Sequence, residues 1–149
     1  MIIRPAGLLV RQGQILMMSY RYGTVTRYTL PGGRLEIGES LTSCLQREFQ
    51  EELGLTVVVG ELLWLAQTSA NDREVLHPLF HVEDPCPDRP LQPTLNPEST
   101  RADGLAWLSA QQVASASLYP AVYDQLQQHL SLDGPCSPVY LGYIRQDWL

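Results

Sequence analysis

The stretch that most constrains the fold runs from Pro31 to Leu55 and reads PGGRLEIGESLTSCLQREFQEELGL. Ser40 stands where a helix N-cap belongs and Gly54 where a C′ glycine belongs, so the pattern between them predicts a helix. At about 100° per residue, one face of this helix is apolar and should be buried: Leu41, Leu45, Phe49 and Leu53. The opposite face is polar and should contact water: Thr42, Ser43, Gln46 and Gln50. The stretch therefore predicts a capped amphipathic helix packed on a core.

The turn before the helix is Pro31-Gly32-Gly33. Glycine adopts backbone conformations with positive φ without steric cost, so this pair predicts a tight turn that uses them.

Three carboxylates border the apolar stripe of the helix: Glu48, Glu51 and Glu52. Like charges four residues apart repel each other, so half-buried carboxylates at this spacing need a counter-charge. Mg²⁺ takes carboxylate and carbonyl oxygens as ligands and retains several waters. Arg47 lies one turn before Glu51 and can pair with it. The residues favour a cation site, and a Glu-rich surface helix is the alternative.

The spacing of these residues resembles the Nudix box at every fixed position: Gly33, five residues, Glu39, seven residues, then the run from Arg47 to Leu55. The resemblance covers roughly residues 2–130 and implies an α/β fold, a Nudix-like α/β/α sandwich with a mixed β-sheet and the box loop and helix at its edge. We expect one Nudix hydrolase domain over residues 1–149, with residues 131–149 as a C-terminal extension that carries an extra strand.

The resemblance also implies an activity. The implied activity is that of a Mg²⁺-dependent pyrophosphohydrolase, with Mn²⁺ as a possible substitute, in which water attacks phosphorus and a phosphoanhydride is cleaved. The substrate would be a nucleoside triphosphate or a nucleoside diphosphate-linked molecule. Two alternatives remain open: a catalytically weak Nudix-fold module that senses a nucleotide, and an acidic interaction domain without enzymatic function.

The site residues follow from the resemblance, position by position. It implies that Glu48 and Glu52 are metal ligands, that Glu51 is a ligand or orients the water, and that the carbonyl of Gly32 adds an oxygen. It implies that Arg47 is an orienting catalytic residue. The loop is expected to be braced by three residues: Gly33, Glu36 and Glu39.

The general base is open at this stage. Glu98, in a loop ahead of the strand that carries Trp107, is the first candidate. Asp103 is the second, and Glu51 of the box is a third. His77 and His81 alternate on a predicted strand and either bind substrate or pack without a catalytic role.

Arginines and tyrosines interleave just before the box, between residues 19 and 28, in what reads as a loop. Arginine donors suit phosphate and tyrosine faces suit a base, so the substrate-binding candidates are Arg21, Arg27 and Tyr28, beside Tyr20 and Tyr22. A loop packed by its own tyrosines is the alternative. No sub-family marker follows the box, so the sequence leaves the nucleotide open.

The rest of the chain alternates between strand and helix patterns. Strands are predicted at 2–10, 14–20, 55–67 with a bulge at Gly60, 74–82 antiparallel to it, 105–108 and 138–144. Residues 84–97 hold five prolines and read as an irregular loop. Two more helices are predicted, at 110–114 after the cap Ser109, and from Pro120 in the first turn to about Leu130, ended by residues 133–135.

Composition limits the partners. The chain has 149 residues, 44% hydrophobic and 17% charged, with a net charge of −6, which fits a globular protein and argues against a nucleic-acid polymer as partner. The three cysteines, Cys44, Cys86 and Cys136, have no metal-binding spacing and read as reduced thiols, with Cys44 in the core. No apolar run is long enough for a membrane span and no signal peptide is recognisable. We therefore expect a cytoplasmic protein with a small nucleotide-type substrate and no membrane partner, and the sequence allows a homodimer.

Overall fold

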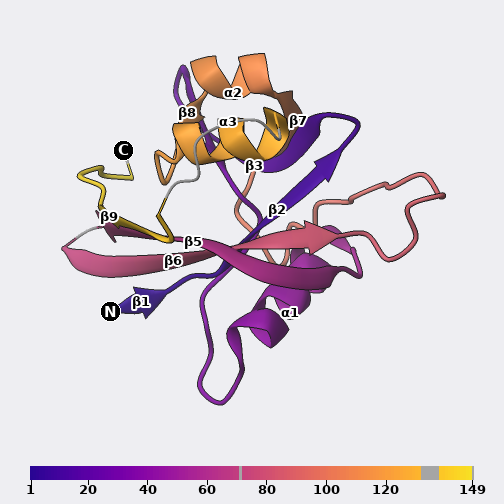
Figure 1. Ribbon diagram of the computed structural model, residues 1–149, viewed down its shortest axis with the longest axis horizontal. Helices are drawn as coiled ribbons and strands as arrows, with labels where there is room; N and C mark the ends of the chain where they lie inside the picture. Colours follow the sequence, from indigo (N-terminus) through magenta and orange to yellow (C-terminus); the bar gives the residue numbers. More distant parts are fainter. Residues whose placement is uncertain (71, 132–137, 149) are drawn as a thin grey trace.

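The computed structural model describes residues 1–70, 72–131 and 138–148. Its secondary structure forms three layers (Figure 1), with a curled sheet between helix α1 (Leu41–Leu53) on one side and helices α2 (Ala110–Ser115) and α3 (Tyr123–Ser131) on the other. The predicted α/β sandwich with a mixed sheet is confirmed.

The strands of the sheet are β1 (Ile2–Ile3), β2 (Ala6–Arg11), β3 (Gln14–Tyr22), β4 (Val25–Thr29), β5 (Val58–Ala70), β6 (Arg73–Glu83), β7 (Gly104–Ser109), β8 (Ser117–Leu118) and β9 (Tyr140–Tyr143). Among the described residues their order is β8-β4-β3-β2-β6-β5-β9, while β1 pairs with β6 and β7 with β3. The β2–β6 and β5–β9 pairs are parallel, and the β5–β6 pair is antiparallel as predicted.

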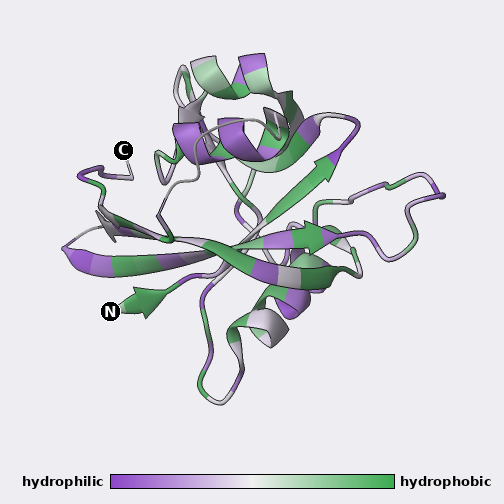
Figure 2. Ribbon diagram, viewed as in Figure 1, coloured by the Kyte–Doolittle hydropathy of each residue, from purple (hydrophilic) through white to green (hydrophobic). Residues whose placement is uncertain are grey.

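The core lies on both faces of this sheet, because successive side chains of a strand point to opposite faces. Leu8 and Leu79 belong to the cluster under α2 and α3, which contribute Val113 and Leu126. The next residues along, Leu9 and Phe80, belong to the cluster under α1, which contributes Leu45, Phe49 and Leu53. Figure 2 shows the apolar colour along the strands between the helices.

Two predicted elements differ in the structure. The predicted loop over residues 19–28 is wrong, because β3 continues to Tyr22 and pairs with β4 from Met18↔Thr29 to Tyr22↔Val25. The tyrosines, Val25 and the threonines of this stretch favour strands, so they form a hairpin here, and Gly23, with φ of +62°, makes its turn. The predicted strand over residues 2–10 is assigned as two strands, β1 and β2, separated by Arg4 and Pro5, where proline has no backbone N–H to donate.

The start of the last helix was also predicted wrongly. Pro120 follows a cis peptide bond and lies ahead of α3, which begins at Tyr123. The predicted end of this helix at residues 133–135 lies outside the described residues, as does Cys136. By contrast, the cap of α2 is confirmed, since Ser109 and Gln112 form a reciprocal capping box.

Strand β5 begins at Val58, three residues later than predicted. Its pairing with β6 shifts register between Val59 and Leu62, around the predicted bulge at Gly60. Cys44 is fully buried as predicted, and Cys86 is exposed. In the described part of the chain, none of the helices has the length and apolar character needed to cross a membrane.

Candidate functional site

The box loop approaches two other segments so closely that only glycine fits. A Cβ on Gly32 would lie 2.1 Å from the carbonyl oxygen of Pro5, and one on Gly33 would lie 2.1 Å from the carboxyl carbon of Glu48. Neither glycine has positive φ, so the predicted reason for the pair is wrong. Both are required for space, which lets the loop lie against β2 and against a carboxylate of α1.

Helix α1 holds the box carboxylates on a rigid element. The hydroxyl of Ser40 accepts a hydrogen bond from the Ser43 N–H at 3.1 Å, and Gly54 ends the helix with φ of +65°. Leu45, Phe49 and Leu53 of the predicted stripe are buried. The caps and the stripe are confirmed, and together they fix the direction of the carboxylates along the border.

Arg47 connects the loop and the helix. Its Nη2 and Nε donate to the two carboxylate oxygens of Glu39 at 2.8 and 3.1 Å, and its Nη1 lies 3.0 Å from Glu48 and 3.2 Å from Glu51. The hydrogen bonds from Arg47 lower the pKa of Glu39 to about 2, and Glu39 in turn raises that of Arg47. The side chain of Glu36 is mostly exposed, 3.8 Å from Arg47, and its backbone N–H donates to Glu39. The structure thus braces the loop through Glu39, with Glu36 acting mainly through its backbone.

Glu52 is the carboxylate with the most unusual surroundings. It is 8% exposed, and its Oε2 is buried with no hydrogen-bond partner among the described residues. Burial, and then the neighbouring Glu48 carboxylate, raise the pKa of Glu52 to about 8. A buried carboxylate without a partner is expensive, so this side chain requires either a proton or a cation.

The donors around Glu52 fit a hard divalent cation. Glu48 lies against Gly33, and the carbonyl of Gly32 is on the same loop, so carboxylate and carbonyl oxygens are available. Within the described residues, no three acidic, histidine or cysteine side chains already form a metal-binding group. Arg47 pairs with Glu48 at 3.0 Å and with Glu51 at 3.2 Å.

The loop that carries Glu98 lies against the C-terminal end of α1. The Asn96 N–H donates to the Glu52 carbonyl at 2.8 Å, and the Asn96 side chain donates to the Glu51 carbonyl at 3.0 Å. These bonds satisfy carbonyls that the end of a helix leaves without partners. Glu98 follows two residues later, and its backbone N–H donates a hydrogen bond to Asn96 Oδ1. The second candidate base, Asp103, instead accepts the backbone N–H of Arg21 at 2.6 Å and holds the β3–β4 hairpin.

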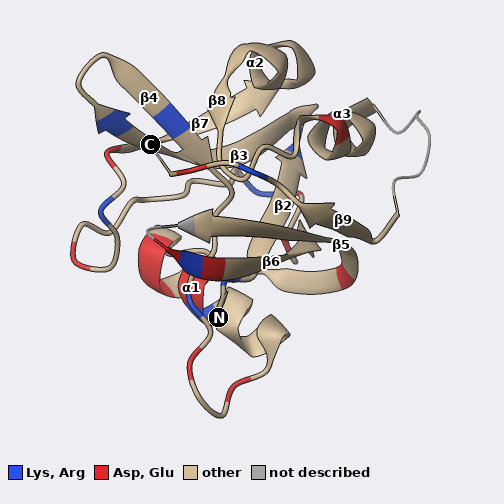
Figure 3. Ribbon diagram, turned by 90° about the vertical axis from the view of Figure 1, so that its left-hand side faces the viewer, with Lys and Arg blue, Asp and Glu red and all other residues tan. Residues whose placement is uncertain are grey.

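The predicted substrate-binding residues lie on the β3–β4 hairpin. Arg21 is exposed near the end of β3. Arg27 donates to the Leu118 carbonyl at 3.3 Å, while its buried Nε has no partner among the described residues. Tyr28 packs partly buried against the core cluster under α2 and α3. Figure 3 shows the basic positions of the β3–β4 hairpin and the acidic part of α1 on the same side of the molecule.

Arg4 is a candidate that the sequence analysis did not select. Its Nη2 donates to the Gly32 carbonyl at 3.4 Å, its N–H donates to the Leu76 carbonyl, and its positive charge acts on both Glu52 and His77. Among the described residues, its guanidinium has no carboxylate within ion-pair distance. The available signal was a charged residue followed by proline inside an apolar strand run.

His77 and His81 have different environments. His77 is buried, its Nε2 lies 2.8 Å from Thr68 Oγ1, and burial followed by Arg4 lowers its pKa to about 3. The same hydroxyl lies 2.8 Å from the hydroxyl of Tyr119. His81 is partly exposed and lies 2.9 Å from Glu83.

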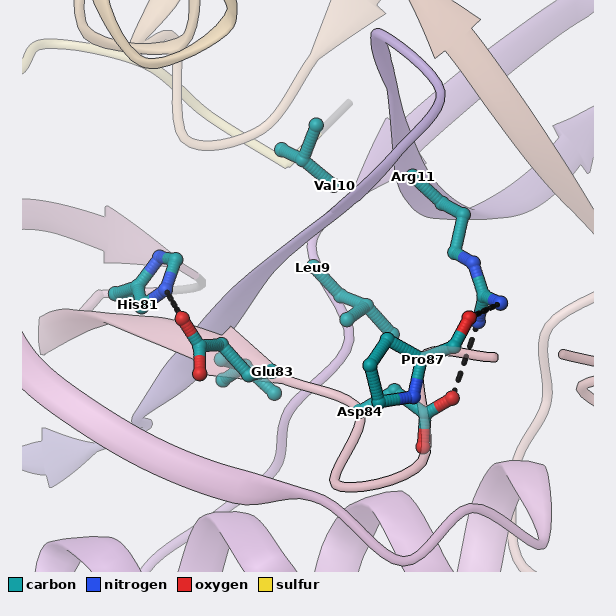
Figure 4. Close-up of a pocket in the computed structure, with 8 residues that line it drawn as sticks. Leu9, Val10, Arg11, His81, Glu83, Asp84 and Pro87 are labelled. Carbon is teal, nitrogen blue, oxygen red and sulfur yellow. Dashed lines mark hydrogen bonds and ion pairs between the residues drawn. The ribbon is translucent and has the colours of Figure 1, made fainter. Parts of the chain in front are cut away.

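His81 and Glu83 line a separate hollow of about 330 Å³ at the ends of β2 and β6. Figure 4 shows this hollow, where Arg11 reaches Asp84 at 3.0 Å and the Pro87 carbonyl at 2.7 Å. Of the candidates from the sequence, His81 lines it, whereas the box carboxylates and the candidate residues of the β3–β4 hairpin do not. Its ion pair fixes the first part of the proline-rich loop, whose later part carries Asn96 to α1.

The chain is similar to known proteins over most of its length. The family model described as NUDIX domain matches residues 1–129. The CTP pyrophosphohydrolase of Escherichia coli (strain K12) is 28% identical over 134 residues, which cover 89% of this chain and 93% of that protein. The solution structure of the E. coli ORF135 protein superposes with a TM-score of 0.67 at 26% identity, covering 88% of this chain and 89% of that one. A MutT protein from Methanosarcina mazei Go1 shares the fold, with a TM-score of 0.69 at 21% identity over 88% of this chain and 93% of its own.

Proposed function

The chain belongs to the NUDIX domain family and is a Nudix hydrolase, and from this premise we propose that it hydrolyses a nucleoside triphosphate with Mg²⁺ as cofactor. The reaction is attack of water at phosphorus. An oxygen–phosphorus bond forms, one phosphoanhydride bond breaks, and the leaving phosphate departs with the bonding electron pair.

The observation that carries the proposal is the environment of Glu52. One oxygen of Glu52 is buried without a hydrogen-bond partner among the described residues. One turn earlier on the same helix, Glu48 lies against Gly33 of the box loop. A carboxylate oxygen that is buried without a protein partner is available to a bound cation. Mg²⁺ bound there would neutralise phosphate charge and lower the pKa of a bound water.

The protein's own residues have distinct roles in this proposal. Glu48 and Glu52, with Glu51 and the carbonyl of Gly32, would hold the cation, and Arg47 orients their helix against the loop. Glu98 takes the proton of the attacking water, from a loop tied to the end of the same helix through Asn96.

Two cationic side chains support binding of the phosphates. Arg4 has a half-buried guanidinium beside Gly32 with most of its N–H donors free of protein partners among the described residues. Arg21 is exposed near the end of β3, on the β3–β4 hairpin. Both can approach an anion without breaking a protein ion pair.

The similarity to a CTP pyrophosphohydrolase leads us to propose a pyrimidine nucleoside triphosphate as substrate. Cleavage between the α- and β-phosphates of CTP would yield CMP and pyrophosphate. An ADP-ribose-type or other diphosphate-linked substrate is the competing class.

The test is product release from a panel of nucleoside triphosphates and diphosphate conjugates, in Mg²⁺ and in EDTA. We expect pyrophosphate release from CTP that requires Mg²⁺ and falls by several orders of magnitude in Glu52→Gln and in Glu48→Gln with the fold retained. Exposed Glu61, on β5, provides a control as Glu61→Gln, which should retain wild-type turnover. Wild-type turnover in Glu52→Gln at saturating Mg²⁺ would refute the site.

A further inference from the structure

The C-terminal segment beyond the family match reaches the β3–β4 hairpin, which carries the predicted substrate-binding residues. After α3, strand β9 pairs in parallel with β5, and the chain then crosses to the β3–β4 hairpin. Three hydrogen bonds mark this course: Ile144 N–H to the Gln67 carbonyl at 2.7 Å, Gln146 Nε2 to the Leu118 carbonyl at 2.7 Å, and Trp148 Nε1 to the Tyr22 hydroxyl at 2.8 Å. The segment is therefore attached to three separate elements.

Trp148 ends this course in an aromatic cluster. Its ring centroid lies 5.3 Å from that of Tyr20, 6.0 Å from that of Tyr22 and 5.1 Å from that of Tyr119, with interplanar angles of 82°, 89° and 90°. Neither core cluster contains Trp148, Tyr20 or Tyr22, and Tyr20 and Trp148 are only partly buried. We call the partly exposed rings of Trp148, Tyr20 and Tyr22 the aromatic platform.

The cluster is connected to the carboxylates by a short series of contacts. Tyr119 lies 2.8 Å from Thr68, which lies 2.8 Å from His77. The residue before His77 accepts the backbone N–H of Arg4, and the side chain of Arg4 reaches the Gly32 carbonyl. The aromatic cluster and the box loop are thus connected through Thr68, His77 and Arg4.

We propose that Trp148, with Tyr20 and Tyr22, stacks against the aromatic base of the substrate, so that the C-terminal segment determines specificity for the half of the molecule that carries no phosphate. The inference rests on the proposed function, because it assigns the other end of the same substrate. Base–aromatic stacking tolerates different bases, since each presents a π-face. The platform therefore selects nucleotides over base-free polyphosphates more strongly than it selects one base over another.

Hydrolysis of paired substrates tests the inference. With Trp148→Ala, we expect KM for CTP to rise on the order of 10- to 100-fold, since stacking contributes at this level per base, while kcat changes little. Hydrolysis of inorganic tripolyphosphate, which has no base, should be unchanged. Trp148→Phe should recover most of the affinity for CTP. The control is Tyr140→Ala, on β9 of the same segment but outside the cluster, which should leave KM unchanged.

Binding of CMP, which contains no phosphoanhydride, separates this inference from the proposed function. Calorimetric titration should show that Trp148→Ala weakens CMP binding by the same factor, while binding of ribose 5-phosphate is unaffected. Absence of hydrolysis together with Trp148-dependent CMP binding would refute the function and support the platform. An unchanged KM and CMP affinity in a folded Trp148→Ala protein would overturn the platform, and so would an equal loss for CTP and tripolyphosphate.

Discussion

Replacing Glu52 by Gln should stabilise the metal-free protein while it removes turnover. Glu52 is 8% exposed, and burial together with Glu48 raises its pKa from 4.5 to about 8. A carboxyl group whose pKa is raised on folding binds its proton more tightly in the folded state. Its contribution to stability is therefore complete below pH 4.5 and is lost as the pH rises towards 8.

The magnitude follows from the interval between the pKa of the unfolded chain and the working pH. The free energy of unfolding falls by about 1.4 kcal/mol for each pH unit in this interval, hence by about 3 kcal/mol at pH 7. Total stabilities of domains are about 5–15 kcal/mol, so this loss is measurable. Glutamine has nearly the same shape but does not ionise, so Glu52→Gln should not show this loss of stability. The difference in the free energy of unfolding between variant and wild type should therefore approach zero near pH 4.5.

Urea denaturation in EDTA at several pH values between 4.5 and 8 measures this difference. The matched control is Glu51→Gln, one residue away on the same helix, where the side chain is 50% exposed and pairs with Arg47. Its stability should change by less than about 0.5 kcal/mol at any of these pH values. This prediction would be refuted if the difference in the free energy of unfolding between Glu52→Gln and wild type did not depend on pH, or if the variant were less stable than the wild type. Either result would mean that folding does not raise the pKa of Glu52.

Three further predictions concern the metal, the base and a buried histidine. Mg²⁺ should raise the melting temperature of the wild type by mass action, and Glu52→Gln should blunt the rise; equal shifts in both proteins would count against the site. Glu98→Gln should lower kcat by about 10²–10⁴-fold with little change in KM and abolish the acidic limb of the pH–rate profile, and retention of that limb would direct the search to Glu51 or Asp103. His77 has its pKa lowered from 6.5 to about 3, so its contribution is complete above pH 6.5 and is lost as the pH falls, at about 1.4 kcal/mol per pH unit. Between pH 7 and pH 5, urea unfolding should show that the free energy of unfolding falls less in His77→Gln than in the wild type. An equal fall in both proteins would mean that folding does not lower the pKa of His77.

The elements that the sequence predicted well are those whose signals are local. The caps Ser40 and Ser109, the stripe of α1 and the strand containing Trp107 each follow from residues within one or two turns of each other. The Nudix resemblance is also local, because its fixed residues span 23 positions from Gly33 to Leu55. Local patterns were therefore sufficient for the fold class and the box.

The features that the sequence did not predict depend on contacts between distant residues. Arg4 becomes a site candidate only because β1 and β2 lie beside the box loop, and Trp148 only because the chain returns to a hairpin 126 residues earlier. The spatial relation of Glu98 to the box likewise depends on Asn96, which binds carbonyls 44 and 45 residues before it. Periodicity and spacing contain no information about such pairings.

The crowding around Gly32 and Gly33 has a consequence for how substitutions at these positions should be tolerated across a saturation library. A glycine retained for positive φ, such as Gly54, is replaced best by asparagine, which enters the left-handed region most readily among other residues. At Gly32 and Gly33 the neighbouring atoms would be 2.1 Å from any Cβ, so the atom that all other residues share is already too large. Asparagine should therefore be tolerated no better there than leucine. The residues that replace each glycine in surviving clones should then distinguish a glycine retained for positive φ from one retained for space.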